Sequence, residues 1–203
     1  MKLFYKPGAC SLASHIVLHE IGQAFDIEAV DTSEGKTAGG ADYLAINPKG
    51  YVPALQMDDG GVLTEGPAIL QFLSDTAPQA GLAPEAGNLS RAKVLEHLTY
   101  VASELHKSFG PLFRSASTDE QKDAARELVG KKFDHIETLL SDGRDFLVDG
   151  AFSIADAHLF TISNWANFTG IDLANWPNLA AYVNRIAARP ATQAAMRAEG
   201  LIQ

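Results

Sequence analysis

The chain has 203 residues, of which 46% are apolar and 20% are charged, and its formal net charge at pH 7 is −9. This length and composition are typical of a globular protein with one large or two small domains, and they exclude disordered, collagen-like and coiled-coil chains. The excess of acidic residues disfavours binding to nucleic acid and to anionic lipid. We expect a cytoplasmic protein, because the chain has one cysteine, no signal-peptide pattern at its start and no apolar run that would span a membrane.

The first 80 residues alternate between strand and helix patterns. The strand patterns are Leu3–Tyr5, Phe25–Val30, Val52–Met57 and Val62–Leu63, and the helix patterns run from Ser11 to Glu20 and from Pro67 to about Thr76. The segment Asp58–Gly61 is a strong hairpin signal between the last two strands. This order predicts an α/β domain with a small mixed sheet.

Residues 89–203 have no convincing strand pattern and predict an all-helical domain. The predicted helices are Leu89–Phe113, Thr118 to Leu140, Ser153 to about Phe168, and two that follow Trp176 and Arg189. The third helix begins with a capping-box pattern and is apolar almost all round, so we expect it to be buried. Residues 78–88 are rich in small residues, proline and glycine and predict a linker, which leaves residues 1–77 as the α/β domain.

Cys10 lies in a turn, Pro7–Ser11, that leads from the first predicted strand into the first predicted helix. A helix N-terminus offers unpaired N–H groups and a partial positive charge, which favour a thiolate and make Cys10 a candidate catalytic residue. The alternative is that Cys10 is a small buried apolar side chain. Ser11 is interpreted either as a catalytic hydroxyl or as the N-cap of the helix.

Two further motifs contain groups suited to a peptide-like ligand. Pro53 directly precedes a strand, where a cis Val52–Pro53 peptide bond would turn the Val52 backbone outward, and an ordinary loop proline is the alternative. Glu65 and Gly66 lie at the start of a helix, whose free N–H groups can bind a ligand carboxylate while Glu65 binds an ammonium group. Taken alone, an acid in the position of Glu65 more often only stabilises the helix dipole.

On the long predicted helix, Thr99, Ser103 and His106 follow i, i+4, i+7 spacing and share one face. This face is either a binding surface or an ordinary solvated surface. His15 and His19 are also four residues apart, but no third residue with ligand spacing accompanies them. We therefore expect no metal site.

Several of these motifs, in this order, resemble those of bacterial beta-class glutathione S-transferases. They are residues 2–11 (KLFYKPGACS), 47–50 (NPKG) with 52–55 (VPAL), 63–67 (LTEGP), 104–107 (ELHK) with 111–113 (PLF), and 189–201. The resemblance covers essentially the whole chain. It implies a thioredoxin-like N-terminal domain with a mixed four-stranded sheet, an all-α C-terminal domain, a homodimer, and glutathione as co-substrate without a prosthetic group.

The resemblance also implies roles for single residues in glutathione binding. Cys10 would lie at the glutathione sulfur, near enough to form a mixed disulfide. Val52, beside a cis Pro53, would pair its backbone with the cysteinyl part of glutathione. Glu65 and Gly66 would bind the γ-glutamyl end.

Further implied contacts come from the helical domain and from one lysine. The helical residues are Thr99, Ser103, Glu104 and His106, some of them reaching across the dimer, with His106 as a second donor to the sulfur. Family members often have lysine where this chain has Gly35, and the only nearby lysine here is one position later. Lys36 is therefore the predicted partner of the glycyl carboxylate. The electrophile pocket is predicted to use Phe109, Leu112, Phe113 and Trp165.

We therefore predict an enzyme, a glutathione transferase that joins glutathione sulfur to electrophilic hydrophobic compounds in detoxification or aromatic catabolism. One alternative is glutathione-dependent thiol–disulfide exchange or peroxide reduction through Cys10, in which glutathione itself resolves the intermediate because no second cysteine is present. The other alternative is a non-catalytic interaction module of the transferase fold. The presence of Cys10, Glu65 and His106 together argues against this module, which needs none of them.

Overall fold

The computed structural model describes all 203 residues of the chain. They divide into two compact units, the first made of Met1–Ala83 together with Ala188–Gln203, and the second made of Pro84–Ala187. The sequence-based division assigned residues 89–203 to one helical domain, whereas the C-terminal segment of the chain groups with the first unit.

The first unit contains a five-stranded sheet and four helices. Its elements in chain order are β1 (Lys2–Tyr5), α1 (Leu12–Ile21), β2 (Asp26–Asp31), β3 (Lys36–Thr37), α2 (Tyr43–Ile46), β4 (Ala54–Gln56), β5 (Val62–Thr64), α3 (Gly66–Thr76), a 3-10 turn at Pro78–Ala80, and α11 (Pro190–Ala198). The strand order is β3-β2-β1-β4-β5, in which β1 and β2 are parallel and the other pairs are antiparallel. The mixed sheet of a thioredoxin-like domain is confirmed, with one strand more than the four expected.

The central strand β1 is buried on both faces of the sheet. Leu3 pairs with Ile27 of β2 and with Leu55 of β4, and its side chain is fully buried. Because successive side chains of a strand face opposite sides, Phe4 points the other way and packs in a cluster with Tyr43. The turn that carries Cys10 therefore starts from a rigid strand.

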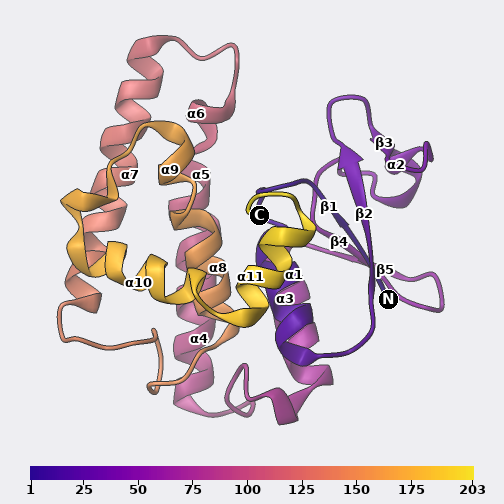
Figure 1. Ribbon diagram of the computed structural model, residues 1–203, viewed down its shortest axis with the longest axis horizontal. Coiled ribbons are helices and arrows are strands. Elements are labelled where there is room, and N and C mark those ends of the chain that lie inside the picture. Colours follow the sequence, from indigo (N-terminus) through magenta and orange to yellow (C-terminus); the bar gives the residue numbers. More distant parts are fainter. The chain divides into compact units, whose positions relative to one another are not determined.

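Helix α1 packs against both α3 and α11 (Figure 1). Its residues Leu12–Leu18 are all buried, so the helix needs apolar partners on more than one side. One of those partners, α11, comes from the C-terminal segment, which explains why this segment belongs to the first unit. Gly22 ends α1 in the left-handed conformation with φ 73°, as its position predicted.

The second unit is entirely helical. Its elements are α4 (Leu89–Tyr100), a π-helical turn (Val101–Leu105), α5 (His106–Ser108), α6 (Gly110–Phe113), α7 (Asp119–Leu140), α8 (Ile154–Ser163), α9 (Ala166–Thr169), a 3-10 turn at Leu173–Asn175, and α10 (Pro177–Ala187). The predicted helix Leu89–Phe113 is thus interrupted, because a π-helical turn follows α4. None of the helices has both the length and the apolar character that crossing a membrane requires.

The predicted capping box at the start of α8 is confirmed. Ser153 and Asp156 each bond to a backbone N–H at the first turn, and every residue of α8 is buried. The helix packs against α4 and α10 within the unit. Its apolar character all round, which the sequence showed, follows from this central position.

Candidate functional site

The turn between β1 and α1 places Cys10 beside the backbone of Val52. The Cys10 thiol donates a hydrogen bond to the Val52 carbonyl oxygen, with 3.3 Å between sulfur and oxygen. The Val52–Pro53 peptide bond is cis, as predicted. No group of the chain accepts from the Val52 N–H. The structure therefore brings Cys10 together with the cis-proline segment and leaves one backbone donor for a ligand.

The surroundings of Cys10 favour the thiol over the thiolate. Burial raises the pKa of Cys10 from 9.0 to about 11. The N–H groups of Cys10 and Ser11, at the start of α1, lower this pKa, but they do so less than burial raises it. The helix N-terminus therefore acts in the predicted direction, but desolvation of the sulfur is the larger effect and the net pKa of Cys10 is raised in the free chain.

Ser11 is fully buried, and its hydroxyl bonds to the turn that precedes it. The hydroxyl oxygen accepts from the Lys6 N–H at 3.3 Å, and the hydroxyl faces the Lys6 carbonyl oxygen at 3.4 Å. It makes no N-cap hydrogen bond to α1. Ser11 thus occupies the N-cap position without capping the helix through its side chain, and the hydroxyl proposed as catalytic is engaged in shaping the turn.

The C-terminal segment holds the same turn in place. The buried Glu199 carboxylate has one oxygen 2.9 Å from Nδ1 of His15 and accepts the Gly8 N–H at 2.8 Å with the other. Gly8 has φ 70°, and Leu201 lies 3.4 Å from the position that a Cβ would take there. A side chain at Gly8 would be strained by this positive φ, while its contact with Leu201 would be an ordinary one. These contacts fix the turn that carries Cys10.

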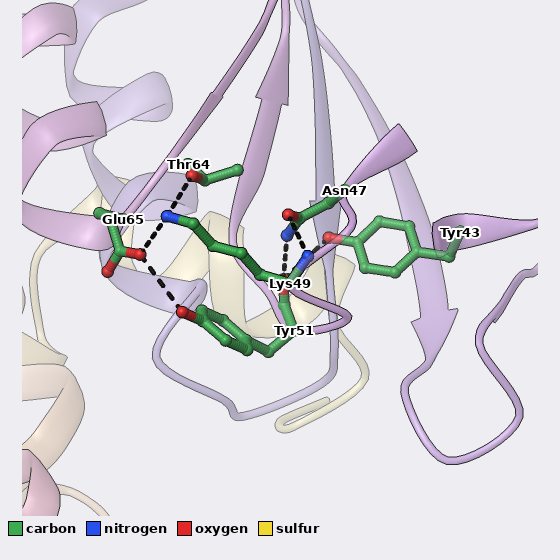
Figure 2. Close-up of polar contacts among 6 residues, drawn as sticks. All are labelled: Tyr43, Asn47, Lys49, Tyr51, Thr64 and Glu65. Carbon is green, nitrogen blue, oxygen red and sulfur yellow. Dashed lines mark hydrogen bonds and ion pairs between the residues drawn. The ribbon is translucent and has the colours of Figure 1, made fainter. Parts of the chain in front are cut away.

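The loop before Pro53 is organised by the buried amide of Asn47 (Figure 2). The Asn47 Nδ2 donates to the Tyr51 carbonyl at 2.7 Å, and its Oδ1 accepts from the Lys49 N–H at 3.1 Å. The Tyr43 hydroxyl also donates to the Tyr51 carbonyl, at 3.0 Å. The side chains of Lys49 and Tyr51 consequently start from a fixed backbone.

Glu65 precedes α3 and faces this loop (Figure 2). Its Oε1 accepts from Lys49 Nζ at 2.5 Å and from the Tyr51 hydroxyl at 3.3 Å. The hydrogen bond from Lys49 is the main reason why the pKa of Glu65 is lowered. Glu65 has φ 71°, an uncommon conformation for a non-glycine residue that clusters at functional sites. A Cβ at Gly66 would meet nothing within 4 Å, so the start of α3 is open to a ligand.

Lys36 lies on β3, at the opposite edge of the sheet from β5 and the following Glu65. It lines a surface cavity of about 520 Å³ together with Lys6 and residues of β2. Cys10, Val52 and Glu65 do not line this cavity. Because Pro7 also lines the cavity, Lys36 lies on the side of the sheet edge where the turn toward Cys10 begins.

In the second unit, the predicted polar residues lie at the break in the long helix. Thr99 is near the end of α4, and its hydroxyl bonds back to the helix backbone. Ser103 and Glu104 lie in the π-helical turn, a feature frequent at functional sites. Ser103 is exposed, and Glu104 pairs with Lys132 at 2.6 Å. The π-helical turn lies between Thr99 and His106, so the i, i+4, i+7 spacing of a regular α-helix does not apply across these residues.

His106 packs edge-on against Trp165, with the ring centroids 4.9 Å apart. The same Trp165 ring contacts Phe109 at 5.6 Å and Phe113 at 5.0 Å. Three residues predicted for the electrophile pocket therefore form one aromatic cluster with His106, and the fourth, Leu112, is half-buried on α6. Burial lowers the pKa of His106, which favours a neutral ring at pH 7.

The paired histidines of α1 are part of the packing of the first unit. The rings of His15 and His19 stack at 5.1 Å, and both contact Phe25 edge-on. No group of three histidine, cysteine or acidic side chains in the structure could hold a metal ion.

Three residues that shape the site were not singled out from the sequence, namely Lys49, Tyr51 and Glu199. The first two lie within the 47–55 motif, and their alternation with the proline was a signal that could have drawn attention to them. Glu199 carried no local signal, because its partners are 184 and 191 positions away in the chain.

Comparison with known proteins identifies the family. The model of the glutathione S-transferase N-terminal domain matches residues 8–76, and that of the C-terminal domain matches residues 100–190. The chain is 47% identical to glutathione S-transferase GstA of Escherichia coli O157:H7 over 99% of its own length and 100% of the relative's. It is 38% identical to glutathione S-transferase GST-4.5 of Xanthomonas campestris, again over 99% and 100%.

Solved structures agree with the sequence relatives. A beta-class glutathione S-transferase of Sphingomonas chungbukensis has a TM-score of 0.96 and 46% identity, and each chain is covered completely. A sphingomonad glutathione S-transferase in complex with glutathione has a TM-score of 0.95 and 48% identity, with the same coverage. The thioredoxin-like unit and the helical unit are therefore those of a known fold, and the chain belongs to the glutathione S-transferase family.

Proposed function

We propose that this chain is a glutathione transferase that joins the sulfur of glutathione to small, largely apolar electrophiles. The observation that carries the proposal is the pairing of the Cys10 thiol with the Val52 backbone, whose N–H has no acceptor within the chain. This arrangement lies in a chain whose whole length matches relatives named glutathione S-transferase. Glutathione acts as a co-substrate, and the family uses no prosthetic group.

In the first unit, glutathione binds as a short extended peptide. The Val52 N–H donates to its cysteinyl carbonyl, and Glu65 takes the ammonium of the γ-glutamyl end. The N–H of Gly66, at the open start of α3, donates to the neighbouring carboxylate. Lys36 remains the proposed partner of the glycyl carboxylate, although its cavity contains none of these groups.

The chemical task is to make the bound glutathione thiol a thiolate. Lowering a thiol pKa from ~8.5 by ~2 units corresponds to ~2.7 kcal/mol. Two or three hydrogen bonds to the charged sulfur supply this amount. Because burial keeps Cys10 protonated, its single S–H can turn from the Val52 carbonyl oxygen to the glutathione sulfur when glutathione binds, and the backbone N–H groups at the start of α1 are further donors.

In the second unit, we propose that His106 donates to the same sulfur and that Thr99, Ser103 and Glu104 contact glutathione, some of them from a second subunit. The aromatic cluster around Trp165 receives the electrophile. The flat aromatic side chains of this cluster suit apolar and aromatic ligands and discriminate little among them. The cluster is therefore consistent with a broad range of electrophiles.

The exchange alternative needs a Cys10 thiolate as nucleophile, and the burial of this thiol opposes it. A non-catalytic interaction module would need neither an unpaired Val52 N–H nor a Glu65 held in an uncommon backbone conformation.

We further propose a cytoplasmic homodimer, since two-fold dimers are the commonest soluble assembly. Sedimentation of a particle of 21.7 kDa at micromolar concentration would contradict the dimer.

An activity panel tests the proposal. The purified protein is incubated with glutathione and, separately, an aryl halide, an organic peroxide and a mixed disulfide, and products are identified by mass spectrometry. The proposal predicts that the thioether from the aryl halide forms faster than in the uncatalysed reaction. Acceleration of the peroxide or disulfide reaction alone would support the exchange alternative, and retention on immobilised glutathione without any acceleration would support the module.

A further inference from the structure

The second unit has a cavity of about 340 Å³ between the α5–α6 segment and α7. Both α5 and α6 pack against the N-terminal half of α7 (Figure 1). Neither His106 nor any member of the aromatic cluster around Trp165 lines this cavity. It is therefore separate from the space that we propose for the electrophile, and its volume lies at the lower end of the range typical of small-molecule sites.

Two cations line the cavity, Lys107 of α5 and Arg114, which directly follows α6. Neither makes a hydrogen bond or an ion pair within the chain. Each of the six other arginines bonds to at least one group of the chain, so Arg114 is the exception among them. Glu104, three positions before Lys107, pairs with Lys132 instead, at 2.6 Å. The cavity thus has two unused positive charges in a chain whose net charge is −9.

The α7 wall of the cavity contains no acid, although α7 itself has six. The residues of this wall follow i, i+3, i+4, i+7 spacing and so share one face of the helix, namely Gln121, Ala124, Ala125 and Leu128. All six acids of α7 lie outside the lining. An acid on this face would neutralise the two cations, and its absence leaves their positive potential available to an anion.

The amide of Gln121 adds a neutral donor to the two cations. Its Oε1 accepts the Thr118 N–H at 3.0 Å in the capping box of α7, which fixes the side chain and leaves its Nε2 without a partner in the chain. The turn before α7 is closed by a hydrogen bond from the Ser117 N–H to the Arg114 carbonyl oxygen at 3.2 Å. Arg114 and Gln121 therefore both extend from an ordered backbone.

The rest of the lining is largely apolar. Leu128 is 44% exposed, and it lines the cavity with Ala124 of the same helix and Pro111 of α6. An exposed leucine alone is common on protein surfaces. Here, however, it lies in a concave space that also contains two cations and an amide donor. This combination of an apolar wall with a few polar groups is typical of a small-molecule site.

We propose that this cavity binds a small amphipathic carboxylate, that is, an anion with an apolar body. The Arg114 guanidinium binds the carboxylate, a pairing whose two parallel hydrogen bonds favour this planar anion. Lys107 and the Gln121 Nε2 supply further donors, and the apolar body lies against Leu128 and Pro111. This ligand is neither glutathione nor the electrophile of the proposed function, because none of the residues assigned to them lines the cavity.

The test is calorimetric titration of two carboxylates, octanoate and 2-naphthoate, each compared with its neutral primary amide. They are titrated into the wild type, Arg114→Met, Gln121→Glu and the control Lys131→Met, which loses a positive charge from α7 outside the cavity. Gln121→Glu preserves the capping box, because glutamate serves at this position as well as glutamine does. Its effect on affinity therefore reports the added negative charge.

We expect the wild type to bind at least one carboxylate about tenfold more tightly than its amide. The carboxylate that binds more tightly shows whether the apolar body is aliphatic or aromatic. Arg114→Met and Gln121→Glu should each weaken carboxylate binding about tenfold and amide binding less than about twofold. Lys131→Met should match the wild type.

Equal affinities for the acids and their amides would overturn the proposal, as would a carboxylate affinity that neither Arg114→Met nor Gln121→Glu lowers. No binding of either carboxylate at millimolar concentration would also overturn it. Circular dichroism shows whether each variant is folded. If one is not, Lys107→Met replaces it, with an expected weakening of carboxylate binding of about threefold. The titrations contain no glutathione, so their outcome does not depend on the proposed function.

Discussion

Asp156 in the second unit and Glu65 in the first are both carboxylates at the beginning of a helix, yet their surroundings differ. Asp156 is fully buried, and its two oxygens accept hydrogen bonds from the Leu147 N–H, the Ser153 N–H and hydroxyl, and the Tyr182 hydroxyl, all at 2.8 to 2.9 Å. Glu65 is half exposed, and its two partners share a single oxygen.

The difference separates a structural polar cluster from the site that we propose for glutathione. Around Asp156 each oxygen accepts two hydrogen bonds from the chain, so the cluster stabilises the fold and leaves neither oxygen without a partner. Around Glu65 one oxygen, one ammonium hydrogen and the Val52 N–H have no partner in the chain. Replacing residues of the Asp156 cluster should therefore lower the free energy of unfolding, and replacing residues around Glu65 should weaken the binding of glutathione.

The largest effect is expected for Asp156→Ala. The substitution leaves several buried donors without acceptors, so the free energy of unfolding should fall by about 3 kcal/mol or more. Urea denaturation followed by circular dichroism measures it. Tyr182→Phe is the matched control, which removes one donor and should cost about 1 kcal/mol. A loss below 1 kcal/mol in Asp156→Ala would mean that the cluster does not hold α8.

A smaller loss of stability is expected for Glu199→Ala. Its buried carboxylate joins His15 to the Gly8 N–H, and both would lose their partner, at a cost of about 2 kcal/mol. The comparison variant is Glu96→Ala, whose exposed pair with Lys93 should contribute less than about 0.5 kcal/mol. Similar denaturation midpoints for the two variants would show that the C-terminal segment does not brace the Cys10 turn.

These contrasts also show which parts of the fold the sequence predicts. The capping box at Ser153 and the helix ending at Leu140 were predicted correctly, because their signals lie within a few residues of one another. The cis bond before Pro53 was also anticipated from its place before a strand. The fifth strand, β3, was missed because two residues are too short to show a period.

The site was less predictable than the fold, for two physical reasons. The pKa of Cys10 depends on how much water reaches the sulfur, which the sequence does not encode locally, and burial outweighs the helix end. The roles of Glu199 and of Lys49 depend on contacts formed only when distant segments pack together. The position of Glu65 at the start of a helix was predicted correctly, because such a start has a recognisable pattern.

A change at Glu65, the carboxylate proposed to bind glutathione, should leave the free energy of unfolding almost unaltered. Glu65→Ala removes the partner of the γ-glutamyl ammonium, so glutathione binding should weaken by about 1 to 3 kcal/mol. Calorimetric titration measures the affinity, and denaturation shows that the fold is retained. Unchanged affinity in a folded variant would return Glu65 to the role of an acid that stabilises the dipole of α3.

The smallest effect on catalysis is expected for Cys10→Ala, although the same change removes one reaction completely. The wild type should gain the mass of one glutathione after treatment with oxidised glutathione. The variant should gain none, because Cys10 is the only cysteine. Conjugation should be reduced less than about tenfold, since the loss is one neutral donor among several.

The most direct test of the account is single-turnover conjugation by Cys10→Ala at saturating glutathione, measured with an aryl halide. Bound glutathione is the nucleophile in this account, and the Cys10 thiol only donates a hydrogen bond to its sulfur. The account therefore predicts a reduced but clearly measurable rate. Complete loss of conjugation in a folded variant that still binds glutathione would contradict it and identify Cys10 as the obligate nucleophile.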